Sequence, residues 1–244
     1  MERAMSDTTF QNKHIVVIGG TSGLGFAVAE AAILNGAFVH IAGREKARLD
    51  DALDQLGHRA SGSVVDVMKE PDIANFFDSI PHVDHLVVTA AVNEPSDVVT
   101  SDIDILRINM ESRFWGAVYS IRHAVPHMPP EGSITLTSGM ATHKPPRGLS
   151  IATAAAGALE TFVRALAIEL SPIRINVINP GPINTPLLQK ALGGTQDAVG
   201  SLGESLPLGK VGEPSDFGHA ALFAMTNRNL SGTTLHLDGA APWI

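Results

Sequence analysis

Residues 18–37 read "IGGTSGLGFAVAEAAILNGA", and this stretch decides the fold. It follows the apolar run "HIVVI" and carries Gly19, Gly23 and Gly25 at G-x-x-x-G-x-G spacing before a helical pattern. The first glycine permits a sharp turn, the second lets the backbone approach a pyrophosphate, and the third permits close packing of helix on strand. The N-terminus of the helix adds N–H donors and positive partial charge. A strand, this loop and a helix together predict a dinucleotide-binding site that also includes Thr21, Ser22 and Leu24.

Outward from this loop, short apolar runs alternate with helix-length amphipathic segments. Such alternation predicts a parallel sheet with helices on both faces and a ligand site at the carboxyl ends of the strands. We therefore expect an α/β fold, a single-domain Rossmann-type doubly wound sheet of about seven strands. The strands are expected at His14–Ile18, Phe38–Ala42, Ser63–Val67, His85–Ala90, Ser133–Ser138, Arg174–Asn179 and Thr233–Asp238, and helices at Gly25–Asn35 and Ile103–His123 among others.

No repeat, low-complexity run or internal boundary divides the chain of 244 residues. Residues 1–12 are expected to form an N-terminal tail and residues 13–244 one domain. The stretch 186–213 is rich in Gly, Leu and Ser, and we interpret it as a substrate lid.

The composition excludes several functional classes. A formal charge of −8 argues against nucleic acid and against an anionic membrane surface, because both require clustered Lys and Arg. The chain has no cysteine, so disulfides, thiolate metal sites and a Cys nucleophile are excluded, and its ten histidines form no zinc-binding pattern. The N-terminus has no apolar signal run and no segment approaches about 20 apolar residues, so we expect a cytoplasmic protein with neither membrane nor metal.

Several separate motifs along the chain resemble the short-chain dehydrogenase/reductase family. The resemblance extends from His14 to about Gly239, although the Thr that usually opens the glycine loop is Ile18 here. It implies that cofactor contacts come from the glycine loop and from the ends of later strands. These contacts are Asp66 and Val67 in "VVDV", Ala90 and Ala91 after the fourth strand, and Pro180, Gly181, Ile183 and Thr185 in "NPGPINTP".

The end of the second strand indicates which dinucleotide is bound. In NAD-using relatives an acidic residue there holds the ribose 2′-hydroxyl. Here that position is Gly43, followed by Arg44, with Lys46 nearby. A carboxylate would repel a 2′-phosphate, whereas a guanidinium can bind it through two hydrogen bonds. An alternative is that Arg44 is only a solvated residue at a helix start, but we predict NADP(H).

The family's catalytic Tyr-x-x-x-Lys pair is absent from the stretch "SIATAAAGALETFVRALAIEL" (Ser150–Leu170). Counting back from Glu169 places the pair at Ala152 and Ala156. Counting forward from Ser138 places it at Ile151 and Ala155 instead. Tyr119 is the one tyrosine of the chain and belongs to the central helix. Loss of a positioned general acid typically costs about 10²–10⁴ in rate, so ordinary ketone reduction should be severely weakened.

Three residues are the candidates for catalytic roles. Ser138 ends the fifth strand, where the family's substrate-polarising Ser belongs, although it could simply cap backbone there. His143 is a titratable group in the following loop, which could equally be a solvated structural loop. Asn109 matches the family's Asn on the central helix, where holding the helix against the sheet end is its expected remaining role.

Three kinds of function are compatible with these residues. The first is an NADP(H)-dependent oxidoreductase with a non-standard site, which acts on a small apolar C=O, C=N or C=C substrate. In it Ser138, His143, water or the substrate handles the proton, and an iminium substrate would leave no anion to stabilise. The second is a non-redox enzyme of the same descent, for cyclisation or dehydration. The third is a non-catalytic NADP(H)-binding protein. The family resemblance also implies a homodimer or homotetramer formed through the central helix, the helix after the active site and the last strand.

Overall fold

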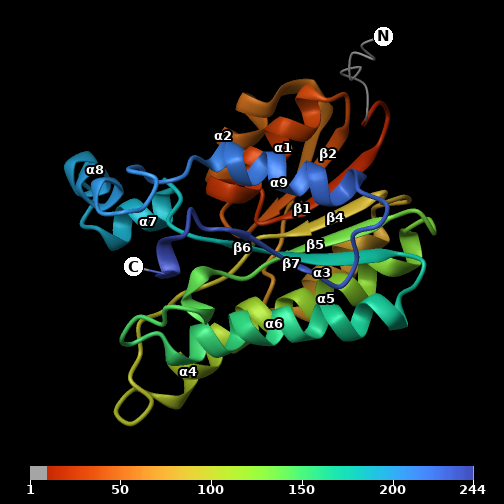
Figure 1. Cartoon of the computed structure of the whole chain (residues 1–244). Helices are drawn as coiled ribbons and strands as arrows, with labels where there is room; N and C mark the ends of the chain where they lie inside the picture. The colour runs from red at the N-terminus through yellow and green to blue at the C-terminus, as the bar shows by residue number, and fades with distance from the viewer. Residues whose placement is uncertain (1–9, 244) are drawn as a thin grey trace.

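The structure, a computed structural model, describes residues 10–243 and is built on a seven-stranded, all-parallel sheet of order β3-β2-β1-β4-β5-β6-β7 (Figure 1). The strands are β1 (His14–Ile18), β2 (Phe38–Gly43), β3 (Ala60–Val64), β4 (His85–Val88), β5 (Ser133–Thr137), β6 (Arg174–Pro180) and β7 (Thr234–Leu237). The order reverses between β1 and β4, which opens a crevice at the carboxyl ends of these strands. The predicted doubly wound fold is confirmed.

Helices cover both faces of the sheet (Figure 1). One face packs against α1 (Gly23–Leu34), α2 (Lys46–Leu56) and α9 (Pro214–Thr226). The other packs against α3 (Glu70–Asp78), α5 (Gly116–Ala124) and α6 (Ser150–Glu169), with α4 (Ile103–Met110) beside α6. The central strands are buried on both faces, which explains why β1 and β4 are apolar almost throughout and why the polar residues of β5 are the small Ser and Thr.

The third strand lies three residues earlier than expected. It pairs with β2 from Val39↔Ala60 to Gly43↔Val64, so the ladder ends where β2 ends. Val65 and Val67 are buried in the core as expected of strand residues, but there is no further residue of β2 for them to pair with. The prediction of Ser63–Val67 was wrong because the apolar pattern marks burial, while the strand itself is the small, polar segment "ASGSV" at the sheet edge.

The predicted central helix, 103–123, is not one regular helix. A π-helical turn, η2 (Glu111–Trp115), separates α4 from α5. Such turns insert one extra residue and are frequent at functional sites. Two residues of this turn, Ser112 and Arg113, are buried and aim at the end of the sheet.

Helix α6 is more apolar than we expected from the sequence, in which we predicted no segment long and apolar enough to span a membrane. It has 20 residues and a mean hydropathy of 1.5 over its most apolar window, so by length and composition it could cross a membrane. It also carries Glu160 and Arg164, and Leu159, Val163 and Leu166 belong to the core packed on the sheet. This packing is that of the core helix of a globular domain.

The predicted lid segment and the predicted N-terminal tail both contain ordered residues. Within 186–213 lie α7 (Pro186–Ala191) and α8 (Gln196–Glu204), which project beyond the sheet (Figure 1). Of the expected tail, residues 1–9 lie outside the described part of the chain. Phe10 is buried and its ring meets His85 edge-on at 5.7 Å, so it belongs to the domain core.

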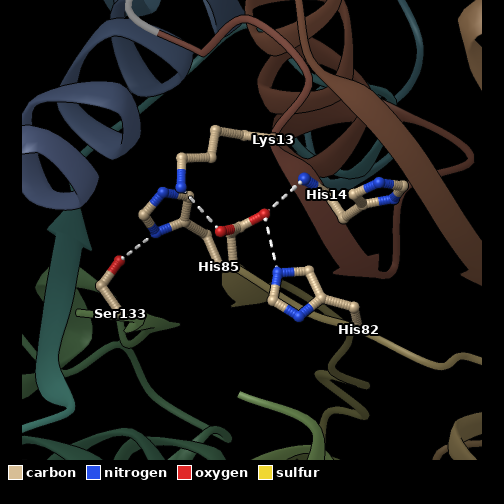
Figure 2. Close-up of polar contacts among 6 residues, drawn as sticks. Lys13, His14, His82, His85 and Ser133 are labelled. Carbon is tan, nitrogen blue, oxygen red and sulfur yellow. Dashed lines mark hydrogen bonds and ion pairs between the residues drawn. The ribbon is translucent and has the colours of Figure 1, made fainter. Parts of the chain in front are cut away.

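A polar cluster ties together the amino ends of β1, β4 and β5 (Figure 2). The buried carboxylate of Asp84 accepts hydrogen bonds from Lys13 Nζ at 2.8 Å and from the His14 backbone N–H at 2.8 Å. His82 Nε2 lies 3.3 Å from the same carboxylate, and these partners hold the pKa of Asp84 below its usual value despite the opposing effect of burial. Since ligands bind at the carboxyl ends of such sheets, we assign this cluster to stability.

Candidate active site

The glycine loop forms an open cradle at the carboxyl end of β1. Gly19 has a φ of +93°, and a Cβ atom there would lie 2.7 Å from the backbone nitrogen of Ala90. A Cβ atom at Gly25 would lie 2.3 Å from the carbonyl oxygen of Gly19. Ser22 is the N-cap of α1 but its side chain makes no capping hydrogen bond, and the first turn holds no carboxylate. The N–H groups of the first turn, at Gly23, Leu24 and Gly25, are therefore available to an anionic phosphate.

Beyond the pyrophosphate position, Gly43 and Arg44 meet the glycine loop from β2. A Cβ atom at Gly43 would lie 2.5 Å from Thr21 Cγ2, so Thr21 leaves no room for the acidic side chain of an NAD-type site. The Arg44 side chain is exposed beside this point. Lys46, by contrast, is engaged by Asp50 at 2.8 Å. Of these two cations, Arg44 is exposed at the end of β2 and Lys46 pairs with Asp50.

Asp66 and Val67 lie in the turn after β3. The Asp66 carboxylate accepts a hydrogen bond from the Met68 backbone N–H at 3.1 Å and lies 3.9 Å from Lys69 Nζ, so it shapes its own turn. Val67 packs against Gly116, where a Cβ atom would lie 2.5 Å from Val67 Cγ2. Both residues lie at the carboxyl end of the sheet, in the turn that follows β3.

The fourth strand ends in "TAA", which closes onto the glycine loop. The Thr89 hydroxyl donates to the carbonyl oxygens of Ile18 at 3.3 Å and Gly19 at 3.2 Å. The Ala90 backbone N–H also donates to the Ile18 carbonyl, at 3.1 Å. These bonds fix the path of Ala90 and Ala91 along the crevice, so a threonine provides the side-chain link in this segment.

The segment Pro180–Thr185 reaches the glycine loop from the end of β6. Gly181 donates its N–H to the Leu237 carbonyl, and Ile183 is buried and forms a bridge with Gly212. Thr185 caps α7 by accepting from the Leu188 backbone N–H. A Cβ atom at Gly23 would lie 3.4 Å from Thr185 Cγ2. The two predicted cofactor segments, distant in sequence, therefore lie against each other.

At the end of β5, Ser138 joins a hydrogen-bond network centred on Glu160 of α6. One carboxylate oxygen of Glu160 accepts from Ser138 Oγ at 2.9 Å, from Thr142 Oγ1 at 3.1 Å and from Asn179 Nδ2 at 2.6 Å. Asn179 Nδ2 also lies 2.9 Å from Thr142 Oγ1. Ala152 and Ala156 lie on the same face of α6, two turns and one turn before Glu160.

A buried guanidinium lies next to this network. Arg113 donates from Nη1 to the carbonyl oxygens of Thr137 and Ser138, both at 3.1 Å, and from Nη2 to Asn93 Oδ1 at 2.8 Å. In the described part of the chain no carboxylate forms an ion pair with it, and its buried Nε has no partner. Burial lowers the pKa of Arg113 to about 10, so it remains a cation at neutral pH.

The remaining predicted residues have other surroundings. Asn109 is buried and its amide both accepts from the Glu94 N–H at 2.9 Å and donates to the Glu94 carbonyl at 3.0 Å, so it holds the loop after β4. Tyr119 donates its hydroxyl proton to Glu111 at 2.8 Å. His143 is exposed, and its ring packs edge-on against His236 at 4.9 Å and Trp243 at 5.9 Å. Among residues 10–243 no three His, Asp or Glu side chains are placed to hold a metal ion.

Comparisons with known proteins agree with this geometry. The family model described as enoyl-(acyl carrier protein) reductase matches residues 19–240. The short-chain dehydrogenase/reductase malC of Malbranchea aurantiaca is 31% identical over 92% of both chains. The chain belongs to the short-chain dehydrogenase/reductase family. It is therefore grouped with the oxidoreductases of that family.

Other short-chain dehydrogenases/reductases are similarly close. ATR9 of Stachybotrys chlorohalonatus is 30% identical over 96% of this chain and 98% of its own. The structure of the MalC reductase/Diels-Alderase from Malbranchea aurantiaca superposes with a TM-score of 0.88 at 30% identity, covering 96% of this chain and 98% of that chain. A small-chain dehydrogenase in complex with NADPH superposes with a TM-score of 0.81 at 33% identity, over 96% of this chain and all of its own.

Two residues of this short-chain dehydrogenase/reductase site, Arg113 and Glu160, were not predicted from the sequence. Arg113 follows Asn109 by four residues, so a helical pattern alone places it on the same face, but only the π turn and the fold bring it to Ser138. Glu160 lies eight residues after Ala152, and its helical spacing would have been a usable signal. Neither side chain belongs to a motif that the family resemblance supplied.

Proposed function

We propose that the protein is an NADP(H)-dependent oxidoreductase that reduces a small apolar substrate without the family's Tyr-Lys pair. The observation that carries this proposal is the contrast between two halves of one crevice. One half is the proposed dinucleotide site, which consists of the glycine loop, Gly43 packed against Thr21, and Arg44. The exposed Arg44 gives this half a positive charge where the ribose 2′-phosphate would bind. When bound, NADPH supplies a hydride to an electrophilic carbon.

The second half of the crevice holds small side chains where the family places its proton donor. Ala152 and Ala156 are buried at the start of α6. Glu160, on the same face, contacts Ser138, and this supports the register that assigns the Tyr and Lys positions to Ala152 and Ala156. A cationic group is still present, because Arg113 lies beneath the Ser138 carbonyl. Its guanidinium is engaged by backbone and amide oxygens, so we propose that it fixes the end of β5 and that the substrate itself needs no strong proton donor.

Cofactor binding tests the first half of the proposal. Titrating intrinsic fluorescence with NADPH and NADH should show tighter binding of NADPH. Arg44→Ala should weaken NADPH binding by about tenfold to a hundredfold, since hydrogen bonds between charged groups contribute about 1.5–3 kcal/mol, and should leave NADH binding unchanged. Lys46→Ala is the matched control, because Lys46 is engaged by Asp50. Equal affinity of the wild type for both dinucleotides would contradict the assignment of Arg44.

Turnover tests the second half. NADPH oxidation should be fastest with a cyclic imine, slower with an enone and slowest with a simple ketone of matched size. The reason is that hydride addition to a cationic C=N carbon leaves no anion for a missing acid to neutralise. If NADPH binds tightly but no acceptor is reduced, the proposal of an enzyme gives way to that of a non-catalytic NADP(H)-binding protein.

A second activity, cyclisation, is favoured by one specific observation. The relative superposed at a TM-score of 0.88 is described as a reductase/Diels-Alderase. A cyclising reaction needs orientation of the reacting groups rather than a proton donor, and the start of α6 offers alanines where the family places that donor. Product formation without NADPH oxidation would support this activity for the present chain.

A further inference from the structure

The Ser138 hydroxyl is held in a fixed orientation by Glu160. A serine hydroxyl has one proton and two lone pairs. The Ser138 proton is donated to Glu160 Oε1 at 2.9 Å, and the Ser138 backbone N–H is occupied by the Ile178 carbonyl at 3.0 Å. Only lone pairs remain on this hydroxyl. Ser138 is 3% exposed, and where its hydroxyl meets a bound substrate it acts as a hydrogen-bond acceptor.

The charged groups around this hydroxyl favour the same kind of ligand, a hydrogen-bond donor. Glu160 is half-buried, accepts from three neutral donors, and has no cationic partner among the described residues. The guanidinium of Arg113 is shared among three oxygens and engages the backbone carbonyl of Ser138, not the hydroxyl. His143 approaches through Thr142, which is 3.2 Å from its Nδ1. The charged group that contacts the Ser138 hydroxyl is thus negative.

These contacts have a consequence for substrate choice. A ketone oxygen brings only lone pairs, so it would meet the lone pairs of Ser138 without a proton between them. A protonated imine brings an N–H donor and a positive charge, which match the acceptor and the carboxylate behind it. Hydrogen bonds that involve a charged group are about twice as strong as neutral ones.

We infer that Glu160 is a specificity-determining positioning residue, which turns Ser138 into an acceptor and so selects a protonated C=N group over a neutral carbonyl. This inference rests on the reductase activity proposed above. In that reaction the imine carbon accepts the hydride and forms a C–H bond. The carbon–nitrogen π pair moves onto nitrogen, so the cation becomes a neutral amine while NADPH is oxidised to NADP⁺. No proton from the protein is required.

The test compares Glu160→Gln with the wild type on a size-matched pair, 3,4-dihydroisoquinoline and 1-tetralone. Glutamine keeps the shape but removes the charge and can donate to Ser138, which frees the serine proton. We expect kcat/KM for the imine to fall by about tenfold or more, since a charge-assisted hydrogen bond contributes about 1.5–3 kcal/mol. The value for the ketone should stay constant or rise. Thr142→Val is the control, because it removes another donor to Glu160 while keeping both the carboxylate charge and the Ser138–Glu160 pair.

Binding provides a readout that does not depend on turnover. Calorimetry with NADP⁺ present should show that tetrahydroisoquinolinium binds the wild type at least tenfold more tightly than Glu160→Gln. Affinity for 1-tetralone should be equal in both proteins or higher in Glu160→Gln. Equal losses for both ligands, or a loss of ammonium binding in Thr142→Val as large as that in Glu160→Gln, would overturn the inference. If Glu160→Gln does not fold, Ser138→Ala replaces it, and an unchanged preference for the ammonium ligand would be the overturning result. Absence of imine reduction together with selective ammonium binding would contradict only the proposed reductase.

Discussion

Replacing Arg113 tests whether a buried cation without a carboxylate partner stabilises this fold. Burial lowers the pKa of Arg113 from 12.5 to about 10. This difference corresponds to about 3 kcal/mol against the charged form. In return, the guanidinium satisfies the carbonyl oxygens of Thr137 and Ser138 and the side-chain oxygen of Asn93.

The two contributions can be compared for Arg113→Met, which fills a similar volume without charge. The substitution removes the desolvation cost of about 3 kcal/mol. It also leaves three oxygens without a donor, at about 1–3 kcal/mol each, or about 6 kcal/mol at the centre of that range. We therefore expect the free energy of unfolding to fall by about 3 kcal/mol, because the orphaned acceptors cost more than the relieved charge.

Urea unfolding followed by far-UV circular dichroism measures this change. Arg113→Lys serves as the companion variant, since its ammonium keeps the charge but cannot span three oxygens in one plane. It should be at least as destabilised as Arg113→Met. A stable Arg113→Met protein together with a stable Arg113→Lys protein would refute the reasoning. It would mean that the three hydrogen bonds contribute less than the buried charge costs.

Three further predictions concern other parts of the molecule. Burial lowers the pKa of His85 to about 4, so below pH 6.5 the unfolded chain binds a proton that the folded chain does not. The free energy of unfolding should then fall by about 3 kcal/mol between pH 6.5 and 4, and urea titrations of His85→Gln should show a smaller decrease. Ile168 on α6 is 81% exposed. If α6 forms a subunit interface, Ile168→Glu should lower the mass measured by light scattering. Leu34→Glu on α1, where Leu34 is 76% exposed, is the control and should leave that mass unchanged. The double substitution Ala152→Tyr and Ala156→Lys should raise the rate of ketone reduction. It should also lower the thermal midpoint of unfolding, because both alanines are buried and overpacking costs about 1–3 kcal/mol per site. Unchanged ketone activity in a folded, NADPH-binding variant would count against the assigned register.

The sequence predicted best what depends on neighbours along the chain. The strands β1, β4, β5 and β6 lie where apolar runs predicted them, to within two residues at the ends. Their residues are buried on both faces of the sheet, so composition alone marks them. The glycine loop was equally predictable from the sequence, because its turn and its close approach to the helix each require the absence of a side chain.

The predictions from sequence were wrong where the local hydrophobic pattern differed from the backbone hydrogen bonding. The third strand was displaced because Val65 and Val67 are buried beyond Val64, the last residue of β3 that pairs with β2. The central helix was read as regular because a π turn changes hydrogen bonding without changing composition. In both places a partner element, not the local sequence, decides the backbone.

The candidate site divides in the same way. The residue types at the start of α6 showed by themselves that the chain has no tyrosine or lysine at the expected positions. Only the tertiary structure revealed that Glu160 holds the Ser138 proton across 22 residues of sequence, and that Arg113 lies beneath the same residue from a separate helix. A sequence determines which groups are available, but the direction of a hydroxyl proton and the charge beside it depend on which distant elements the fold brings into contact.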